Sequence, residues 1–276
     1  MKALLTLRPP ESKQLIARAV VHREEVQAAL DEGLLVVGAG STNAAVAQHC
    51  TKTPVDPARF LAGMVIRGTL CVTPREQRLP NLVLVKGEPV DTAPKEALDL
   101  EVTPKVLIKG ANAVDPAGNC GVLMAAPDGG TVGRLLGPFL SAGWPVITPV
   151  GLEKLIPSVP EAVKELGRWV LDRSLGAKVG MMPLLRTTVI TEIQALHALA
   201  GVTAIQVAAG GICDSEGSVT LTVEGPTQKV EAALALVEEV KGAETPWPPL
   251  NDCETCKLMC DYRGRKNENR PKNLQK

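Results

Sequence analysis

The chain has 276 residues, of which 45% are hydrophobic and only 2% aromatic, and its 30 Lys and Arg residues balance its 30 Asp and Glu residues. This balance favours neither nucleic acid nor an anionic membrane surface as a partner, and no apolar run is long enough to span a bilayer. We therefore expect a cytoplasmic protein. Its core of Val, Leu, Ile and Ala is typical of a buried parallel sheet covered by helices.

The first part of the chain predicts a helix, a strand, a tight turn and a second helix. The spacing of apolar residues over 11–32 is typical of an amphipathic helix, and Gly33 would end it. The apolar run Leu34 to Val37 predicts a short strand buried on both faces. This strand stops at Gly38-Ala39-Gly40-Ser41-Thr42, and small residues at helical spacing follow, beginning with Asn43.

The turn after this strand has two possible uses. Glycines let the backbone bend sharply and approach a ligand closely, and the first amides of a helix have no partners within the helix. Ser41 or Thr42 could cap these amides, or the amides could bind an anion. The sequence leaves both uses open, but it excludes a Walker loop and lacks the third glycine of a dinucleotide-binding fingerprint.

Two further loops are expected at the same edge of the sheet. Strands are predicted within "NLVLVKG", "KVLIKG" and "WPVITPVG", and a capping box at Ser158 and Glu161 predicts a helix that continues to Leu171. Loops at the carboxyl ends of parallel strands share one edge, where ligands bind. We therefore expect the loops 38–42, 109–115 and 128–133 to form a cleft for a small anion. Its candidate residues are Gly38, Gly40, Ser41, Thr42, Asn43, Lys109, Gly110, Asn112, Gly129, Gly130 and Thr131.

Two stretches, "DEGLLVVGAGSTNAAVA" and the segment from "VLIKGANAVD" to "GLEKLIP", carry a resemblance that covers roughly residues 12 to 156. They resemble the superfamily of ribose-5-phosphate isomerase, glucosamine-6-phosphate deaminase, DeoR-type sensor domains, initiation factor 2B-like proteins and CoA-transferases. The resemblance implies a doubly wound, mostly parallel three-layer α/β sandwich, a Gly-x-Gly-Ser-Thr turn that holds phosphate, and a homo-oligomer.

One departure from this superfamily bears on the reaction. The isomerase carries Asp-Gly-Ala-Asp-Glu where this chain has Lys109-Gly110-Ala111-Asn112-Ala113. An amide cannot act as a general base, so isomerisation by that mechanism is not expected. Lys109 and Asn112 would instead donate hydrogen bonds to an anionic ligand. The alternative is that Lys109 only ends a strand in solvent.

The rest of the chain predicts a smaller unit and a tail. The order of strand 177–185, helix 190–200, strands 202–209 and 218–224, and helix 227–240 indicates a small α+β unit that resembles a ferredoxin-like sandwich. The expected organisation is an α/β domain at 1–175, this small unit at 176–242, and a segment 243–276 with a Pro-rich linker, a cysteine cluster and a solvated basic tail.

The cysteine cluster is the sharpest chemical signal in the sequence. Cys253-x-x-Cys256-x-x-x-Cys260 has the spacing with which thiolates grip a metal. Soft thiolates favour zinc or an iron–sulfur cluster, and the sequence does not choose between them. Cys213 is the proposed fourth ligand, with Cys120 as the other candidate, and the alternative is that the open position binds substrate or an external thiolate. A further alternative is that the three tail cysteines are reduced thiols without a metal. The other two cysteines, Cys50 and Cys71, are expected in the core.

Three classes of function follow from these features. The first is a protein that binds a phosphate-, nucleotide- or CoA-bearing ligand, and the second is a metal- or cluster-assisted enzyme that acts on that ligand. The third is an acyl-CoA-type transferase, which needs a nucleophilic carboxylate such as Glu153 or Glu216. The sequence assigns no catalytic residue.

Overall fold

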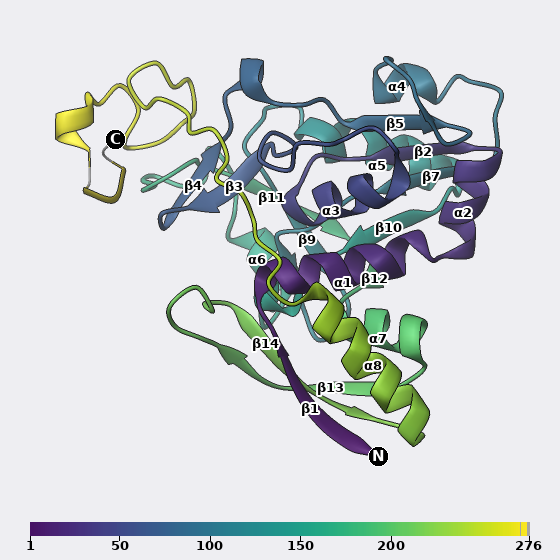
Figure 1. The fold of residues 1–276 in the computed structure, drawn as a ribbon. Coiled ribbons are helices and arrows are strands. Elements are labelled where there is room, and N and C mark those ends of the chain that lie inside the picture. Colours follow the sequence, from purple (N-terminus) through teal and green to yellow (C-terminus); the bar gives the residue numbers. More distant parts are fainter. Residues whose placement is uncertain (271, 275–276) are drawn as a thin grey trace.

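The computed structural model describes residues 1–270 and 272–274 and shows a mixed α/β fold (Figure 1). Its largest sheet has six strands in the order β12-β10-β7-β2-β5-β6, of which β12, β10, β7 and β2 are parallel. These strands are β12 (Thr188–Ile190), β10 (Val146–Pro149), β7 (Lys105–Ile108), β2 (Leu34–Val37), β5 (Leu82–Val85) and β6 (Glu88–Pro89). The structure confirms a mostly parallel sheet with the predicted strands at its centre.

The apolar strands of this sheet pack on both faces. In β2, Leu35 and Val37 join one hydrophobic cluster, whereas Leu34 and Val36 join the other. The first cluster contains helices α1 (Pro9–Val21), α3 (Ser41–Cys50) and α7 (Glu192–Ala200), and the second contains α5 (Gly130–Ala142). Because side chains of a strand alternate between faces, a continuous apolar run of this kind requires cover on both sides.

The predicted helix over 11–32 is two helices. α1 ends at Val21, and α2 (Glu24–Asp31) begins after His22 and Arg23. The two halves have different partners, because α1 packs against α3, α7 and α8 (Thr227–Val240) while α2 packs against β2 and β7. The break therefore lets one amphipathic sequence cover two surfaces.

The helix predicted to run from Ser158 to Leu171 is shorter than expected. Ser158 accepts a hydrogen bond from the Glu161 amide at 3.2 Å, which confirms the start of α6 (Val159–Lys164). The helix stops before Gly167, a residue that weakens a helix, and Val170 beyond it is 67% exposed. The short α4 (Pro94–Ala97) completes the α-helices of the described residues.

A smaller antiparallel sheet differs from the predicted α+β unit in one strand. Its order is β1-β14-β13, with β1 (Lys2–Leu7), β14 (Ser218–Glu224) and β13 (Thr203–Gly210). The strand predicted at 177–185 exists as β11 (Gly180–Leu184), but it pairs with β9 (Cys120–Met124), which also pairs with β8 (Ala113–Val114). The first residues of the chain take its place, because β1 buries Leu5 and Leu7 against the same core.

The C-terminal segment crosses the molecule to a separate hairpin. It runs from α8 to β3 (Gly63–Ile66) and β4 (Thr69–Val72), where it is drawn in yellow in Figure 1. The prediction of a solvated tail is wrong for part of this segment, because Tyr262 and Arg270 are 9% and 6% exposed. Residues 271, 275 and 276 lie outside the described residues. No helix in the described part of the chain is long and apolar enough to cross a membrane.

Candidate functional site

The three predicted loops meet at the carboxyl ends of β2 and β7. A Cβ atom built on Gly38 would lie 3.2 Å from Lys109 Cδ and 3.5 Å from Thr131 Cγ2. A Cβ on Gly110 would lie 3.4 Å from Asn43 Oδ1. Lys109 and Thr131 therefore both lie beside Gly38, and Asn43 lies beside Gly110, so the three loops are adjacent at this edge of the sheet.

Asn43 holds the first two loops together. It is completely buried in the first turn of α3, and its Nδ2 donates to Gly38 O at 2.6 Å and to Ile108 O at 3.3 Å. These bonds join the carboxyl ends of β2 and β7. Its Oδ1 is buried without a hydrogen-bond partner, so this amide oxygen is an acceptor available at the meeting point of the loops.

Asn43→Ala is expected to lower the free energy of unfolding by about 2–4 kcal/mol, because two buried carbonyls lose their donor. Urea unfolding followed by circular dichroism measures this change. Gln48→Ala on the exposed side of α3, which removes one 3.5 Å hydrogen bond, is the control and should change stability much less. Equal effects for the two variants would contradict the role assigned to Asn43.

The start of α3 has no side-chain cap. The N-cap residue is Gly40, which has no side chain, and the helix begins at Ser41. The predicted alternative in which Ser41 or Thr42 serves as the N-cap is therefore wrong, because the turn extends one residue less than expected. Thr42 is buried and Ser41 is half-buried, so Ser41 is the more accessible of the two hydroxyls.

The third loop uses its own side chains to satisfy its backbone. The Gly130 amide donates to Asp128 Oδ1 at 2.9 Å, so this amide is already bonded to a carboxylate. Gly129 and Gly130 have φ values of 71° and 62°, a conformation that favours glycine. Thr131 donates to Asn81 Oδ1, which also accepts from the Ala39 amide. The glycines of this loop thus serve its geometry, and Asn81 joins it to the first loop.

Asn112 and Lys109 occupy different environments. Asn112 is exposed, and its Oδ1 accepts from the Leu123 amide at 3.0 Å, which attaches the second loop to β9. Lys109 is half-buried, and its Nζ donates to Gly110 O at 2.9 Å. Burial and the charge of Lys154 lower the pKa of Lys109 to about 8. The alternative of a solvated strand-end lysine is therefore wrong.

Two lysines that sequence reasoning did not single out complete the site. Burial, followed by the charge of Lys154, lowers the pKa of Lys13 to about 8, against an opposing effect of Glu153. Lys154 thus interacts with both Lys13 and Lys109. We call Lys13, Lys109 and Lys154 the lysine cluster. Lys154 follows β10, the third parallel strand at this edge, and that position is the signal that could have found it.

Two carboxylates lie beside the lysine cluster. Glu153 Oε1 lies 3.5 Å from Lys154 Nζ, and its Oε2 is buried without a hydrogen-bond partner. Glu192 is completely buried, and its Oε2 accepts from the Leu152 amide at 2.9 Å. Burial and the nearby Glu153 raise the pKa of Glu192 to about 7. Near neutral pH, the three lysines therefore carry more positive charge than these carboxylates offset.

The other proposed nucleophile lies in the β13–β14 turn. Glu216 is exposed there. The same turn approaches the lysine cluster from outside, since a Cβ on Gly217 would lie 3.5 Å from Glu153 Cβ. Of the two carboxylates considered for acyl transfer, Glu153 is therefore the one within the candidate site.

A hollow of about 520 Å³ beside the small sheet also contains cations, but these are paired with carboxylates. Arg8 and Lys241 line it, and both pair with the buried carboxylate of Glu11 at 3.0 and 3.2 Å. Arg8 also pairs with Glu244 at 3.3 Å, so two carboxylates balance these two cations. The lysine cluster is thus the better candidate for binding an anion.

The predicted metal ligands are not all together. Cys213 is exposed in the β13–β14 turn with φ 51°, so the expectation that it approaches the tail cysteines is wrong. Cys120 is buried near Asp115 and Lys154, and burial raises its thiol pKa to about 12. Cys50 is in the core as predicted.

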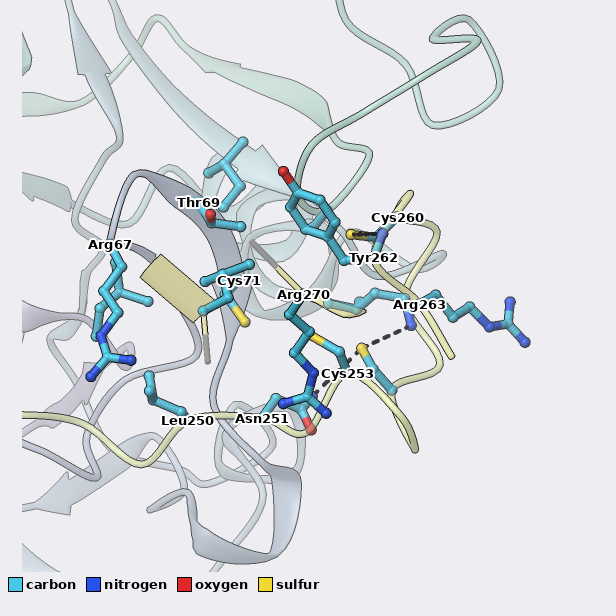
Figure 2. Close-up of a pocket in the computed structure, with 16 residues that line it drawn as sticks. Arg67, Thr69, Cys71, Leu250, Asn251, Cys253, Cys260, Tyr262, Arg263 and Arg270 are labelled. Carbon is cyan, nitrogen blue, oxygen red and sulfur yellow. Dashed lines mark hydrogen bonds between the residues drawn. The ribbon is translucent and has the colours of Figure 1, made fainter. Parts of the chain in front are cut away.

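Cys253, Cys256 and Cys260 line one cavity, and Cys71 from β4 lines it as well (Figure 2). The prediction of a core position for Cys71 is therefore wrong. Burial raises the pKa of Cys71, and the tail thiols raise it further. Within residues 1–270 and 272–274, no group of three or more His, Cys, Asp or Glu side chains is arranged to hold a metal ion.

The cysteine cavity and the lysine cluster are separate places in the fold. None of the residues that line the cavity belongs to the lysine cluster or to the three glycine loops. Comparison of the chain with protein-family models, with curated proteins and with solved structures finds no match. The resemblance to the ribose-5-phosphate isomerase and CoA-transferase superfamily therefore stays a prediction, and the function is argued from the site alone.

Proposed function

We propose that the protein binds a small anionic ligand, one that carries a phosphate, nucleotide or CoA group, at the lysine cluster. The observation that carries this proposal is that the charge of Lys154 acts on both Lys13 and Lys109, whose pKa values are lowered to about 8. Bringing like charges together in a partly buried place is unfavourable. An anion placed among them relieves both the repulsion and the loss of hydration.

The surrounding groups suit a phosphate or a similar anion. Lysine binds phosphate as a compact charge with three donors, and the first amides of α3 lie in the same loop as Gly38 and Gly40. A helix N-terminus adds donors and a favourable dipole for negative charge. The doubly wound three-layer arrangement implied by the superfamily resemblance would place a ligand at this same edge.

Proton uptake on binding provides a test that needs no knowledge of the natural ligand. A bound anion raises the pKa of Lys13 and Lys109, so at pH 8 binding should take up protons. Isothermal titration with inorganic phosphate, a sugar phosphate, ATP and acetyl-CoA, each in two buffers of different ionisation enthalpy, measures this uptake. The affinity should fall as the pH rises above 8, because the lysines then lose their charge.

A control titration uses a neutral sugar, which should not bind or take up protons. If none of the four anions at millimolar concentration gives a heat of binding or stabilises the protein against heat, the proposal is overturned. Binding whose heat is the same in both buffers would place the anion elsewhere, and would overturn it as well.

A second candidate, acyl transfer from an acyl-CoA, is favoured by Glu153. Its partly buried carboxylate lies next to Lys154 and has one oxygen without a partner. In such a reaction the carboxylate attacks the thioester carbonyl, an acyl–glutamyl anhydride forms, and CoA leaves as the thiolate. The freed CoA thiolate then attacks the glutamyl carbonyl of the anhydride. The acyl group leaves as its free carboxylate, and Glu153 carries a glutamyl–CoA thioester. Mass spectrometry after mixing with acetyl-CoA should find this adduct on Glu153, and its absence would leave the binding function alone.

A further inference from the structure

Four cysteines that are far apart in the sequence share one cavity. Cys71 lies on β4, and Cys253, Cys256 and Cys260 lie in the tail loop that faces it (Figure 2). The cavity has a volume of about 50 Å³. A water molecule needs roughly 10–15 Å³ on this measure, so the space among the thiols is larger than one water.

The tail loop is attached to the body of the protein at several points. Lys178 N donates to Met259 O at 2.8 Å, and Asp261 N donates to Ser174 O at 3.0 Å. The side chain of Asp261 also pairs with Arg173 at 2.6 Å. The position of the three tail cysteines opposite Cys71 is therefore fixed by hydrogen bonds between segments.

Backbone amides point at two of the sulfurs. The Leu258 amide donates to Cys256 Sγ at 3.4 Å, and the Tyr262 amide donates to Cys260 Sγ at 3.3 Å. In each case the donor lies two residues after the cysteine, so the chain turns around the sulfur. Backbone amides that donate to cysteine sulfur are also found around iron–sulfur clusters.

The walls of the cavity suit a buried anionic group of some bulk. Leu70, Leu250 and Leu258 are among the apolar residues that line it, and Arg263 and Arg270 also line it. Four thiolates with an iron–sulfur cluster carry net negative charge, which a nearby guanidinium group partly offsets, although that of Arg270 also pairs with Asp252. Apolar walls and hydrogen bonds to sulfur are features with which proteins tune iron–sulfur clusters.

The size of the cavity favours a cluster over one zinc ion. Zinc binds thiolates at about 2.3 Å, which brings four sulfurs to within roughly 4 Å of one another. The cavity that the four thiols line has a volume of about 50 Å³, more than one ion bound directly to four thiolates would occupy. Several irons and inorganic sulfides would fill that space, whereas a single ion would leave it empty.

We propose that Cys71, Cys253, Cys256 and Cys260 hold an iron–sulfur cluster in this cavity. The inference is independent of the proposed anion-binding function, since the two sites share no residue. Cys71 replaces Cys213 as the fourth ligand, because β4 and not the β13–β14 turn lies against the tail loop.

The test measures iron, acid-labile sulfide and zinc in the full chain, expressed with added iron and purified without oxygen. The expected result is more than one iron per chain with a matching amount of sulfide, as in a [2Fe–2S] or [4Fe–4S] cluster. Cys71→Ser should lose most of this iron, as Cys253→Ser should. Cys213→Ser, which changes an exposed cysteine outside the cavity, should keep all of it.

Alkylation of the wild-type chain tests the same assignment without relying on a variant that folds. In the anaerobic protein, Cys71 and the three tail cysteines should be protected from iodoacetamide, while Cys213 reacts. Removal of iron with a chelator should expose all four together. Zinc in place of iron, no bound metal, or a Cys71→Ser variant with its full iron content would each overturn the proposal.

Discussion

Lys154→Ala is expected to weaken binding of pyrophosphate, used as a compact probe, by about 10- to 100-fold. The loss corresponds to one charged hydrogen bond of about 1.5–3 kcal/mol at about 1.4 kcal/mol for each factor of ten. The charge of Lys154 acts on both Lys13 and Lys109, so its removal affects both of the other cations. Isothermal titration at pH 7 measures the change.

The same substitution has a second readout that simple damage to the fold would not produce. Removing Lys154 removes its repulsion, so the pKa values of Lys13 and Lys109 should rise. The affinity of the variant should therefore decline at a higher pH than that of the wild-type protein. Lys52→Ala, an exposed lysine just beyond α3, is the matched control and should leave both the affinity and the pH profile unchanged. An equal loss in both variants would mean that only overall charge matters.

Glu192→Gln is expected to stabilise the protein at pH 8 by roughly 3 kcal/mol and to change little at pH 4.5. Burial raises the pKa of Glu192 from its ordinary 4.5 to about 7, so the folded state resists ionisation of this carboxyl. In the unfolded chain the carboxyl ionises near pH 4.5. Stability is therefore lost as the pH rises from about 4.5 through 7, and the full loss, at about 1.4 kcal/mol per pH unit, is present above 7.

Urea unfolding at the two pH values measures this difference. The glutamine stays neutral and can still accept the hydrogen bond from the Leu152 amide, so it avoids the loss. Glu216→Gln, in the exposed β13–β14 turn, is the control and should have no such pH-dependent effect. A stability difference that is the same at pH 4.5 and 8 would show that the buried carboxyl is not what titrates.

The centre of the large sheet could be predicted because its signals are local. Four consecutive apolar residues, a glycine turn and a helix are all present within residues 34–50, and the structure has them there. The similar stretches "VLVKG" and "VLIKG" show what local sequence cannot predict, because the chain takes a different path after each. Lys86 and Gly87 have φ values of 50° and 77° and turn the chain back into β6, whereas Lys109 ends a parallel strand. Strand direction depends on what each strand pairs with.

How well each candidate site could be predicted depends on how close its residues lie to one another in the sequence. The meeting of three loops follows from the geometry of a parallel sheet, and that expectation is confirmed by the contacts of Gly38 with Lys109 and Thr131. Lys13 reaches the site from α1, where its spacing looks like any exposed helical lysine. Cys71 stands in "TLCV", which is typical of a core strand. Only the docking of the tail, set by contacts about 180 residues further along the chain, reveals its role.

The pairing of β1 with β14 has a consequence for how the chain reaches this structure. Lys2 lies opposite Glu224 in that ladder, so the small sheet gains its middle strand only after more than 200 further residues have been made. Until then, Leu5 and Leu7 lack the strand beside which they are buried. Contacts between such distant residues slow folding. During synthesis, Leu5 and Leu7 therefore expose apolar surface until β14 has been made and can pair with β1.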